Sequence, residues 1–435
     1  MVILFKESII HKELFKQFFS VSGLITSNRF LALLMGVLIA RSVTPHEYGI
    51  YSYVLSVVSI ASIPVISGVQ LMLSKGIALA TSKSEHQKYD ELILCSRYHV
   101  IVAGTISVLI LVICSAFPKH LTLPILMLCI GIVFFRAMLS RGSSILYGLE
   151  HYHFSQVGAL ILVPLSILLL LSAANMVELT VNGVWLLSFS LVATLIAVLF
   201  TAMVLIRKSP NSVPWNTVVK PLALRRWYLH LFTFGFASTL FIINTEYVSL
   251  VLAWLSSADQ IAYYKVALHG AAMLSLFSMA SNYVLNPKIA KLYADKRYVE
   301  CQNLLDISVR INTIISIPLV VVLYFFGYDL LSILFGDNYT DAYTPLMIFA
   351  VGHLVNVATG SVGVVLNMTG NEKVTAQTLG YTMLLSVPLT FLFILFYGSA
   401  GAALGAASCI ILWNIWMARK VVQITNLRTW LAIAR

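Results

Sequence analysis

The sequence predicts an all-α polytopic membrane protein, with twelve transmembrane helices in two pseudo-symmetric six-helix lobes around a central cavity. The first observation behind this prediction is composition: 59% of the 435 residues are hydrophobic and 10% are charged. The second is a mean hydropathy of +0.91. The third is a weak internal repeat that relates the two halves of the chain. Compositions of this kind are typical of chains that cross a membrane many times.

Twelve apolar segments are each long enough to cross a bilayer, which takes roughly 20 residues for about 30 Å of hydrocarbon. Backbone polar groups in lipid must be paired within the segment, so each segment is predicted to be a helix. Arg29 interrupts the first segment and no small-residue cleavage site follows it, so we expect a retained helix rather than a signal peptide. The segments lie near 18–40, 50–73, 98–117, 121–147, 154–174, 183–206, 229–254, 260–285, 308–326, 343–367, 375–397 and 399–418.

The Lys and Arg residues between the segments fall almost entirely on one side of the predicted membrane. If the N-terminus is cytoplasmic, the opposite side carries only Arg41 and Lys119. Cytoplasmic loops carry an excess of Lys and Arg, so both termini are predicted to be cytoplasmic. The net charge of +11 then reflects this topology and an attraction to anionic membrane lipid. No nucleic-acid partner is expected, because the chain has no soluble basic domain to hold one.

The two halves of the chain repeat each other weakly. Residues 40–51 align without gaps to 253–264, at an offset of 213, and 147–152 match 369–374 at an offset of 222. An offset of six helices preserves orientation in the membrane, so the halves are predicted to be parallel repeats that move against each other. The predicted parts are an N-terminal lobe (1–206), a cytoplasmic basic linker (207–228) and a C-terminal lobe (229–435).

Several cations lie inside or at the edges of the apolar segments. Arg29, Arg136 and Arg141 have no acidic residue beside them in the sequence. A charge near the bilayer centre costs about 2.5–3.5 kcal/mol, and guanidinium groups bind phosphate oxygens strongly, so these arginines are predicted to bind an anionic substrate. Lys265 and Arg310 join this predicted set, although both lie close enough to helix ends to extend to the headgroups.

Glu246 is the acidic residue that lies well inside a predicted helix. Two alternatives remain open: it pairs with Arg29, or it takes up a proton or cation and couples an ion gradient to transport. His269 and His353 can titrate near neutral pH and join the predicted ion-coupling set, although a buried neutral histidine with a hydrogen bond is the commoner case. Small and polar residues on the same helices more often mediate helix packing than binding.

Four stretches of the chain carry a family resemblance. Residues 38–69, LIARSVTPHEYGIYSYVLSVVSIASIPVISGV, resemble the first loop and second helix of the polysaccharide transporter family, which typically read A-R-x-L-x-P-x-E-Y-G-x-Y. These are the O-antigen flippases of the Wzx type, in the multidrug/oligosaccharidyl-lipid/polysaccharide exporter superfamily. Ala262 departs from the glycine usual in the second repeat. The other similar stretches are SSADQIAYYKVAL, NPKIAKLY and LLSILFGDNY.

The resemblance implies a function as well as a twelve-helix fold. Such a protein moves an undecaprenyl-diphosphate-linked oligosaccharide, the O-antigen repeat unit of lipopolysaccharide biosynthesis, from the cytoplasmic to the periplasmic leaflet of a bacterial inner membrane. The resemblance also implies alternating access, coupling to a proton or Na+, and cooperation with other polysaccharide assembly proteins. By motif position, Arg29 is the counterpart of the helix-one arginines that meet the diphosphate in related flippases.

Two other classes of function are alternatives to a flippase. A multidrug exporter of the same fold, acting as a cation antiporter, handles mostly cationic compounds and needs buried carboxylates; this chain offers Glu246 against three to five cations. A membrane enzyme is expected to show a large soluble loop or clustered carboxylates, and the sequence has neither. No catalytic residue, cofactor or metal site is therefore expected.

Overall fold

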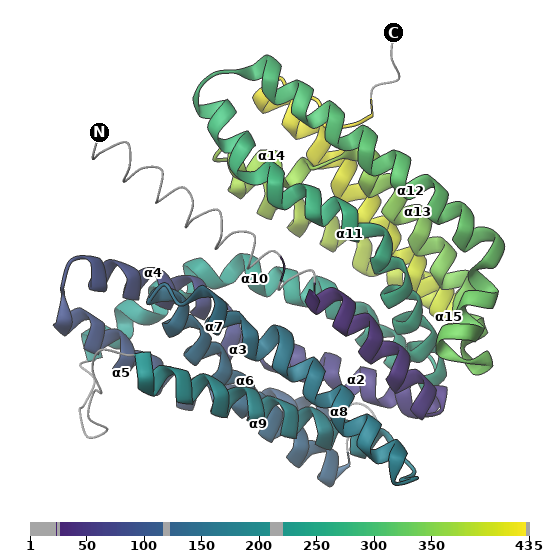
Figure 1. Ribbon diagram of the computed structural model, residues 1–435, viewed down its shortest axis with the longest axis horizontal. Helices are drawn as coiled ribbons and strands as arrows, with labels where there is room; N and C mark the ends of the chain where they lie inside the picture. The colour runs from purple at the N-terminus through teal and green to yellow at the C-terminus, as the bar shows by residue number, and fades with distance from the viewer. Residues whose placement is uncertain (1–22, 24–26, 116–121, 209–220, 432–435) are drawn as a thin grey trace. The chain divides into compact units, whose positions relative to one another are not determined.

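The computed structural model describes residue 23 and residues 27–115, 122–208 and 221–431, and every regular element in these ranges is helical (Figure 1). The first helix covers residues 27–42 of the described chain. The helices that follow up to the middle of the chain are α2 (Pro45–Ala61), α3 (Ile63–Ile66), α4 (Val69–Ser82), α5 (His86–Ser115), α6 (Leu123–Gly148), α7 (Tyr152–Val157), the π-helical turn η1 (Gly158–Leu162), α8 (Val163–Met176) and α9 (Gly183–Lys208). The remaining elements are α10 (Pro221–Leu255), α11 (Ala258–Ala294), α12 (Tyr298–Phe335), the 3-10 turn η2 (Asp337–Ala342), α13 (Tyr343–Thr359), α14 (Val362–Met368) and α15 (Glu372–Thr425).

The described parts of all twelve predicted segments lie almost entirely within these helices. Nine helical spans among the described residues are long and apolar enough to cross a membrane. The chain is therefore an all-α polytopic membrane protein, as predicted. Several helices extend beyond the apolar segments, and α11 continues to Ala294 where the segment was expected to end near 285. The reason is that hydropathy detects only the part of a helix in hydrocarbon, whereas its ends continue into the polar layer.

The segment predicted as one helix over 50–73 is broken instead into α2, α3 and α4. The chain turns at Gly68, whose φ of 74° lies in the left-handed region that favours glycine. A Cβ there would come within 2.6 Å of the backbone nitrogen of Gly235 on α10. The hydroxyl of Ser67 also donates to the Gly235 carbonyl over 2.8 Å. The break is thus shaped by a contact with a helix far away in the sequence, which the apolar pattern does not reveal.

The second half of the chain contains two comparable interruptions. Gly360, with φ of 73°, separates α13 from α14. Gly398 adopts non-helical backbone angles within α15 and so separates the last two predicted segments. The amide of Ser399, next to this break, donates to the side-chain oxygen of Gln260 over 2.8 Å. A buried backbone donor freed from its helix needs such a partner, so the bond stabilises the interruption.

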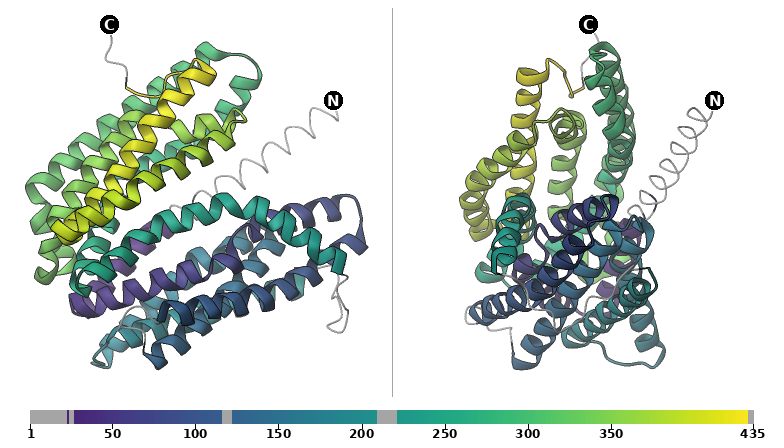
Figure 2. Two further views of the ribbon diagram at one scale, coloured as in Figure 1. Left: turned by 180° about the vertical axis from the view of Figure 1, so that it is seen from behind. Right: turned by 90° about the vertical axis from the view of Figure 1, so that its left-hand side faces the viewer.

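The described residues form two compact units. The first contains those of 1–42 and 54–246, and the second those of 43–53 and 247–435. Consequently α2 and α10 each contribute residues to both units. Within the first unit α6 packs along α9, and within the second α13 packs along α15 (Figures 1 and 2). Residues 209–220 of the predicted linker lie outside the described residues, and the lobe boundaries stay a prediction.

The start of α2 packs on the start of α11 within the second unit. A Cβ on Gly49 would overlap the carbonyl oxygen of Ala258, so glycine is required for this approach. The hydroxyl of Tyr339 donates to the carbonyl of Val43 over 3.1 Å, and its ring meets Tyr48 edge-on with centroids 6.1 Å apart. Pro45 and Ala258, the first residues of α2 and α11, are related by the same 213-residue offset found in the sequence.

Candidate functional site

The first helix is anchored one residue before Arg29. The side-chain amide of Asn28 donates to the carbonyl of Leu160 over 2.7 Å. Leu160 lies in the π-helical turn η1, and such turns displace carbonyl groups from the regular helical ladder. The Asn28 amide therefore satisfies an acceptor created by the turn and fixes the rotation of the first helix. Arg29 itself is exposed in the first unit.

Arg136 and Arg141 both lie on α6 but contact different helices. Five helical residues separate directions by about 140°, so the two side chains leave α6 on different faces. Arg136 donates through Nη1 to the hydroxyl of Ser59 on α2, at a long 3.4 Å. Arg141 donates through Nε to the hydroxyl of Ser96 on α5 over 2.8 Å. Both arginines are half-buried, and each of these two hydrogen bonds is made to a neutral hydroxyl.

A neutral hydroxyl orients a guanidinium without cancelling its charge. In the part of the chain that the structure describes, Arg141 has no carboxylate partner. Its remaining N–H donors keep their capacity to bind an anion, since a guanidinium has five donors and its Nε–H alone is engaged by Ser96. Ser59 and Ser96 were not singled out in the sequence, because nothing in their local pattern distinguishes them from serines that only pack helices.

Glu246 is half-buried on α10 and is the last residue of the first unit. No ion pair between Glu246 and Arg29 is seen among the described residues, and pairing with Arg29 stays a prediction. Ion pairs among the described residues include those of His46 with Asp259, Lys88 with Glu85 and Arg297 with Glu300. A role for Glu246 in ion coupling stays a prediction.

The second unit contains the other residues of the predicted site. Lys265 and His269 are half-buried on α11, one helical turn apart, whereas Arg310 is exposed on α12. His353 is half-buried on α13, and its Nδ1 is buried with no hydrogen-bond partner in the described chain. No group of three or more His, Cys, Asp and Glu residues that could hold a metal ion occurs among the described residues.

Many polar side chains of the second unit bond to each other between helices. The hydroxyl of Ser281 on α11 donates to Asn312 on α12 over 2.9 Å, and Ser361 donates to Asn282 over 2.5 Å. The hydroxyl of Tyr247 lies 3.1 Å from that of Thr390. These bonds agree with the helix-packing role expected for small polar residues in membrane helices. These groups therefore contribute packing between helices rather than charge to the predicted site.

The fold defines a class of protein, the all-α polytopic membrane protein. An inward-facing multidrug resistance MATE family transporter of the MOP superfamily superimposes with a TM-score of 0.74, at 13% identity, over 93% of this chain and 98% of its own. The lipid II flippase MurJ in an inward closed conformation gives a TM-score of 0.68, at 16% identity, over 92% of this chain and 87% of its own. Identities this low establish the fold alone.

The family follows from the sequence. A model of the polysaccharide biosynthesis protein family matches residues 38–344, most of the chain, so the chain belongs to this family. This confirms the family resemblance that the sequence predicted. Capsular polysaccharide biosynthesis protein CapF of Staphylococcus aureus is 28% identical over 170 residues, which are 39% of this chain and 43% of CapF. Lipid II flippase MurJ of Burkholderia cenocepacia is 28% identical over 139 residues, 31% of this chain and 25% of MurJ. The chain thus matches less than half the length of either relative.

Proposed function

We propose that this protein is a flippase for a lipid-linked oligosaccharide, carrying an undecaprenyl-diphosphate-linked O-antigen repeat unit between the leaflets of a bacterial inner membrane. The observation that carries the proposal is Arg141, a half-buried membrane cation whose recorded partner is the neutral hydroxyl of Ser96. A charge is retained in a membrane helix where it meets protein, water or a ligand. A diphosphate supplies the opposite charge, and the names of the MurJ and CapF relatives support a cargo of this class.

The proposed mechanism is alternating access by two lobes, 1–206 and 229–435, joined by the linker 207–228. The first lobe offers Arg29, Arg136 and Arg141 to the diphosphate, and the second offers Lys265 and Arg310. Cations on both lobes would let the anion stay paired while access changes from the cytoplasmic to the periplasmic side. The protein is a transporter rather than an enzyme in this proposal.

A multidrug exporter is the second candidate, and the MATE structures among the structural neighbours favour it. Such an exporter would place a cationic compound beside Arg136 and Arg141, where like charges repel. Glu246 is the acidic residue that the sequence places well inside an apolar segment, where it could offset such charges. The balance of charge therefore favours an anionic cargo.

Deletion of the gene in a strain of known surface polysaccharide, followed by complementation with variants, tests the proposal. Each lost charge-assisted hydrogen bond should cost about 2–3 kcal/mol, which lowers cargo occupancy by about 30–150-fold. Arg29→Ala and Arg136→Ala should therefore reduce surface polysaccharide strongly and leave lipid-linked repeat units in the cytoplasmic leaflet. Lysine at either position should restore part of the transport, since it retains charge without the planar fork.

Arg207→Ala is the matched control, because Arg207 is an exposed cation in the last turn of α9 and outside the predicted site. Protein abundance in the membrane is measured for every variant. Normal polysaccharide in both alanine variants, or losses explained entirely by low abundance, would remove the role assigned to the arginines. Intact polysaccharide together with altered dye export in the deletion strain would favour the multidrug exporter.

Ion coupling belongs to the same proposal, with Glu246, His269 and His353 as the coupling residues and a proton or Na+ as the ion. Protonating a half-buried carboxylate removes its desolvation penalty. Protonation can therefore change the relative free energies of the conformations that alternate during transport. Glu246→Gln should impair transport without lowering membrane abundance. Transport by Glu246→Gln at the normal rate across a range of pH would place coupling elsewhere.

A further inference from the structure

A cavity of about 640 Å³ opens in the first unit, and no residue of the predicted transport site is among those that line it. Its walls come from residues 72–79 of α4 and from the first turns of α5 and α10. The C-terminal end of α4 and the first turns of α5 and α10 lie beside the basic segments that the charge distribution places on the cytoplasmic side. The cavity is therefore at the depth of the lipid headgroups in the proposed orientation.

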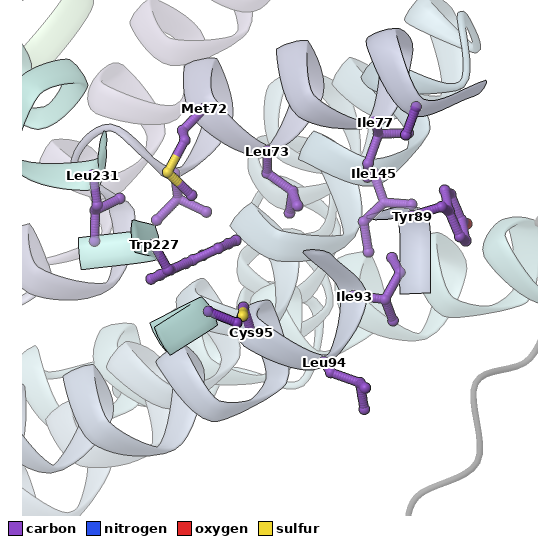
Figure 3. Packing of buried hydrophobic residues seen from close by; sticks show 13 residues of the cluster. Met72, Leu73, Ile77, Tyr89, Ile93, Leu94, Cys95, Ile145, Trp227 and Leu231 are labelled. Carbon is purple, nitrogen blue, oxygen red and sulfur yellow. The ribbon is translucent and has the colours of Figure 1, made fainter. Parts of the chain in front are cut away.

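The floor of the cavity is apolar and firmly packed. Met72, Cys95 and Trp227 line it, and all three belong to a cluster of buried side chains contributed by α4, α5, α6 and α10. Figure 3 shows the Trp227 ring between Met72 and Cys95. Further apolar surface comes from Leu79 and Leu92. Such a floor gains little from water or a free inorganic ion and is stabilised when hydrocarbon covers it.

The rim of the cavity is cationic. Lys75, Lys88 and Arg226 line it with a single carboxylate, Glu91. Lys88 lies 3.2 Å from Glu85, which offsets its charge in part. In the described part of the chain neither Lys75 nor Arg226 has a carboxylate partner. These two side chains give the rim its affinity for an anion.

Lys75 contacts an aromatic ring where the apolar floor meets the charged rim. The Lys75 ammonium lies 5.6 Å from the centroid of the Phe234 ring, within the range of a cation–π interaction. Beside the cavity, α4 and α10 present Leu71 and Phe232 outward, 59% and 75% exposed. Apolar helix surface thus continues outward from a charged rim. Such a surface accepts a ligand that has an anionic head and a hydrocarbon tail.

We propose that this cavity is a binding site for an anionic glycerophospholipid of the membrane. The lipid phosphate lies between Lys75 and Arg226, and the first methylenes of an acyl chain cover Leu79 and Leu92. A volume of about 640 Å³ is within the range of small-molecule sites and accommodates a headgroup with the start of one chain. The cytoplasmic leaflet supplies anionic lipid at this depth. The site holds a resident lipid, and none of the residues assigned to the transported cargo lines it.

The test measures lipid retained by the purified full-length protein, using native mass spectrometry after exchange into nanodiscs. The probes are phosphatidylglycerol and phosphatidylcholine of matched chain length. We expect phosphatidylglycerol to be retained in preference, because one basic residue near a membrane surface contributes about fivefold in affinity for anionic lipid. Lys75→Gln and Arg226→Gln should each weaken retention by about that factor, whereas Glu91→Gln should strengthen it.

Lys83→Gln is the matched control, since Lys83 is an exposed cation at the C-cap of α4 that does not line the cavity. It should leave retention unchanged. Equal retention of both lipids, or a loss in Lys83→Gln as large as in Lys75→Gln, would overturn the site and leave only a diffuse attraction to charged lipid. Retention of added undecaprenyl phosphate in place of phosphatidylglycerol, abolished by the same two substitutions, would overturn the assignment to a glycerophospholipid. These binding readouts are independent of whether the protein transports an oligosaccharide.

Discussion

Gly49 controls how closely two helices approach in the second unit. Its hydrogen faces the carbonyl of Ala258, and a methyl group there would overlap that oxygen. The sequence marked Gly49 only as part of a family motif. The physical reason became visible when the start of α11, distant along the chain, was placed beside it. Ala262, the repeat-related position, is fully buried and carries a methyl group, so the two repeats pack differently at this point.

Gly49→Ala is expected to destabilise the protein by about 1–3 kcal/mol, since inserted atoms in a packed region force the backbone to shift. The midpoint of thermal unfolding of the purified protein measures the effect. Gly104→Ala is the control, because Gly104 lies within α5 with nothing within 4 Å of its position for a Cβ. That substitution should be neutral or stabilising by up to about 1 kcal/mol. Equal midpoints for the two variants would show that α2 moves aside without penalty.

The sequence identified which cations lie in membrane helices but not what they contact. Arg136 and Arg141 were predictable because a charge within a long apolar run is conspicuous. Their partners Ser59 and Ser96 were not, because each lies on another helix and resembles many other serines. The charge of a residue and its depth in the membrane can be predicted from its own segment. Its contacts depend on which helices pack together in the folded protein.

The π-helical turn η1 and the first helix act as one structural element through Asn28. The turn was not predicted, because the apolar run over 154–174 fits a regular helix equally well. Gly158, its first residue, has no room for a bulkier group, since a Cβ there would lie 2.9 Å from the hydroxyl of Thr201 on α9. The η1 turn is therefore held by two contacts, its close packing against α9 and the hydrogen bond from Asn28.

Asn28→Leu should leave the Leu160 carbonyl without its partner and destabilise the contact by about 1–3 kcal/mol. Amide hydrogen exchange measured by mass spectrometry should become faster across the η1 turn and the adjoining residues of α8. Ser188→Ala is the control, since the hydroxyl of this half-buried residue bonds to the Val184 carbonyl within its own helix α9. Unchanged exchange in Asn28→Leu would mean that the turn is held by α9 alone.

Helix existence was easier to predict than helix interruption. Lipid requires every spanning segment to pair its own backbone, so the apolar runs determine where helices occur. The interruptions at Gly68, Gly360 and Gly398 depend on what lies opposite each glycine. Gly398 has Gln260 beside it, from a helix more than a hundred residues earlier. No local pattern carries that information.

For the whole molecule, the charge asymmetry predicts the orientation in the membrane. Reporter fusions after Lys88, after Pro214 and at Arg435 should give cytoplasmic signals, and fusions near Val177 and Asp337 periplasmic signals. The reason is that Lys and Arg flanking short loops retain those loops in the cytoplasm. Alkaline phosphatase and green fluorescent protein fusions measure the two sides independently. A consistently opposite pattern would reverse the proposed direction of loading.

The division of α2 and α10 between units predicts that the two halves of the chain depend on each other. A chain cut within 209–220 yields a first half that lacks residues 221–246 of its own unit, and a second half that lacks 43–53. Each half expressed alone should be degraded or give a broad thermal transition, whereas co-expressed halves should co-purify. Halves that are separately stable, with sharp unfolding transitions, would show that residues 207–228 separate independent lobes.

The close packing of Gly49 on Ala258 also affects the order in which parts of the chain can fold during synthesis. A ribosome adds about 5–20 residues per second, so residues 43–53 enter the membrane about 10–40 s before the start of α11 has been made. During that interval residues 43–53 lack α11, the helix on which they pack in the folded protein. Folding of this chain therefore cannot proceed strictly from the first helix to the last. One of the earliest segments to be synthesised is among the last to reach its final place.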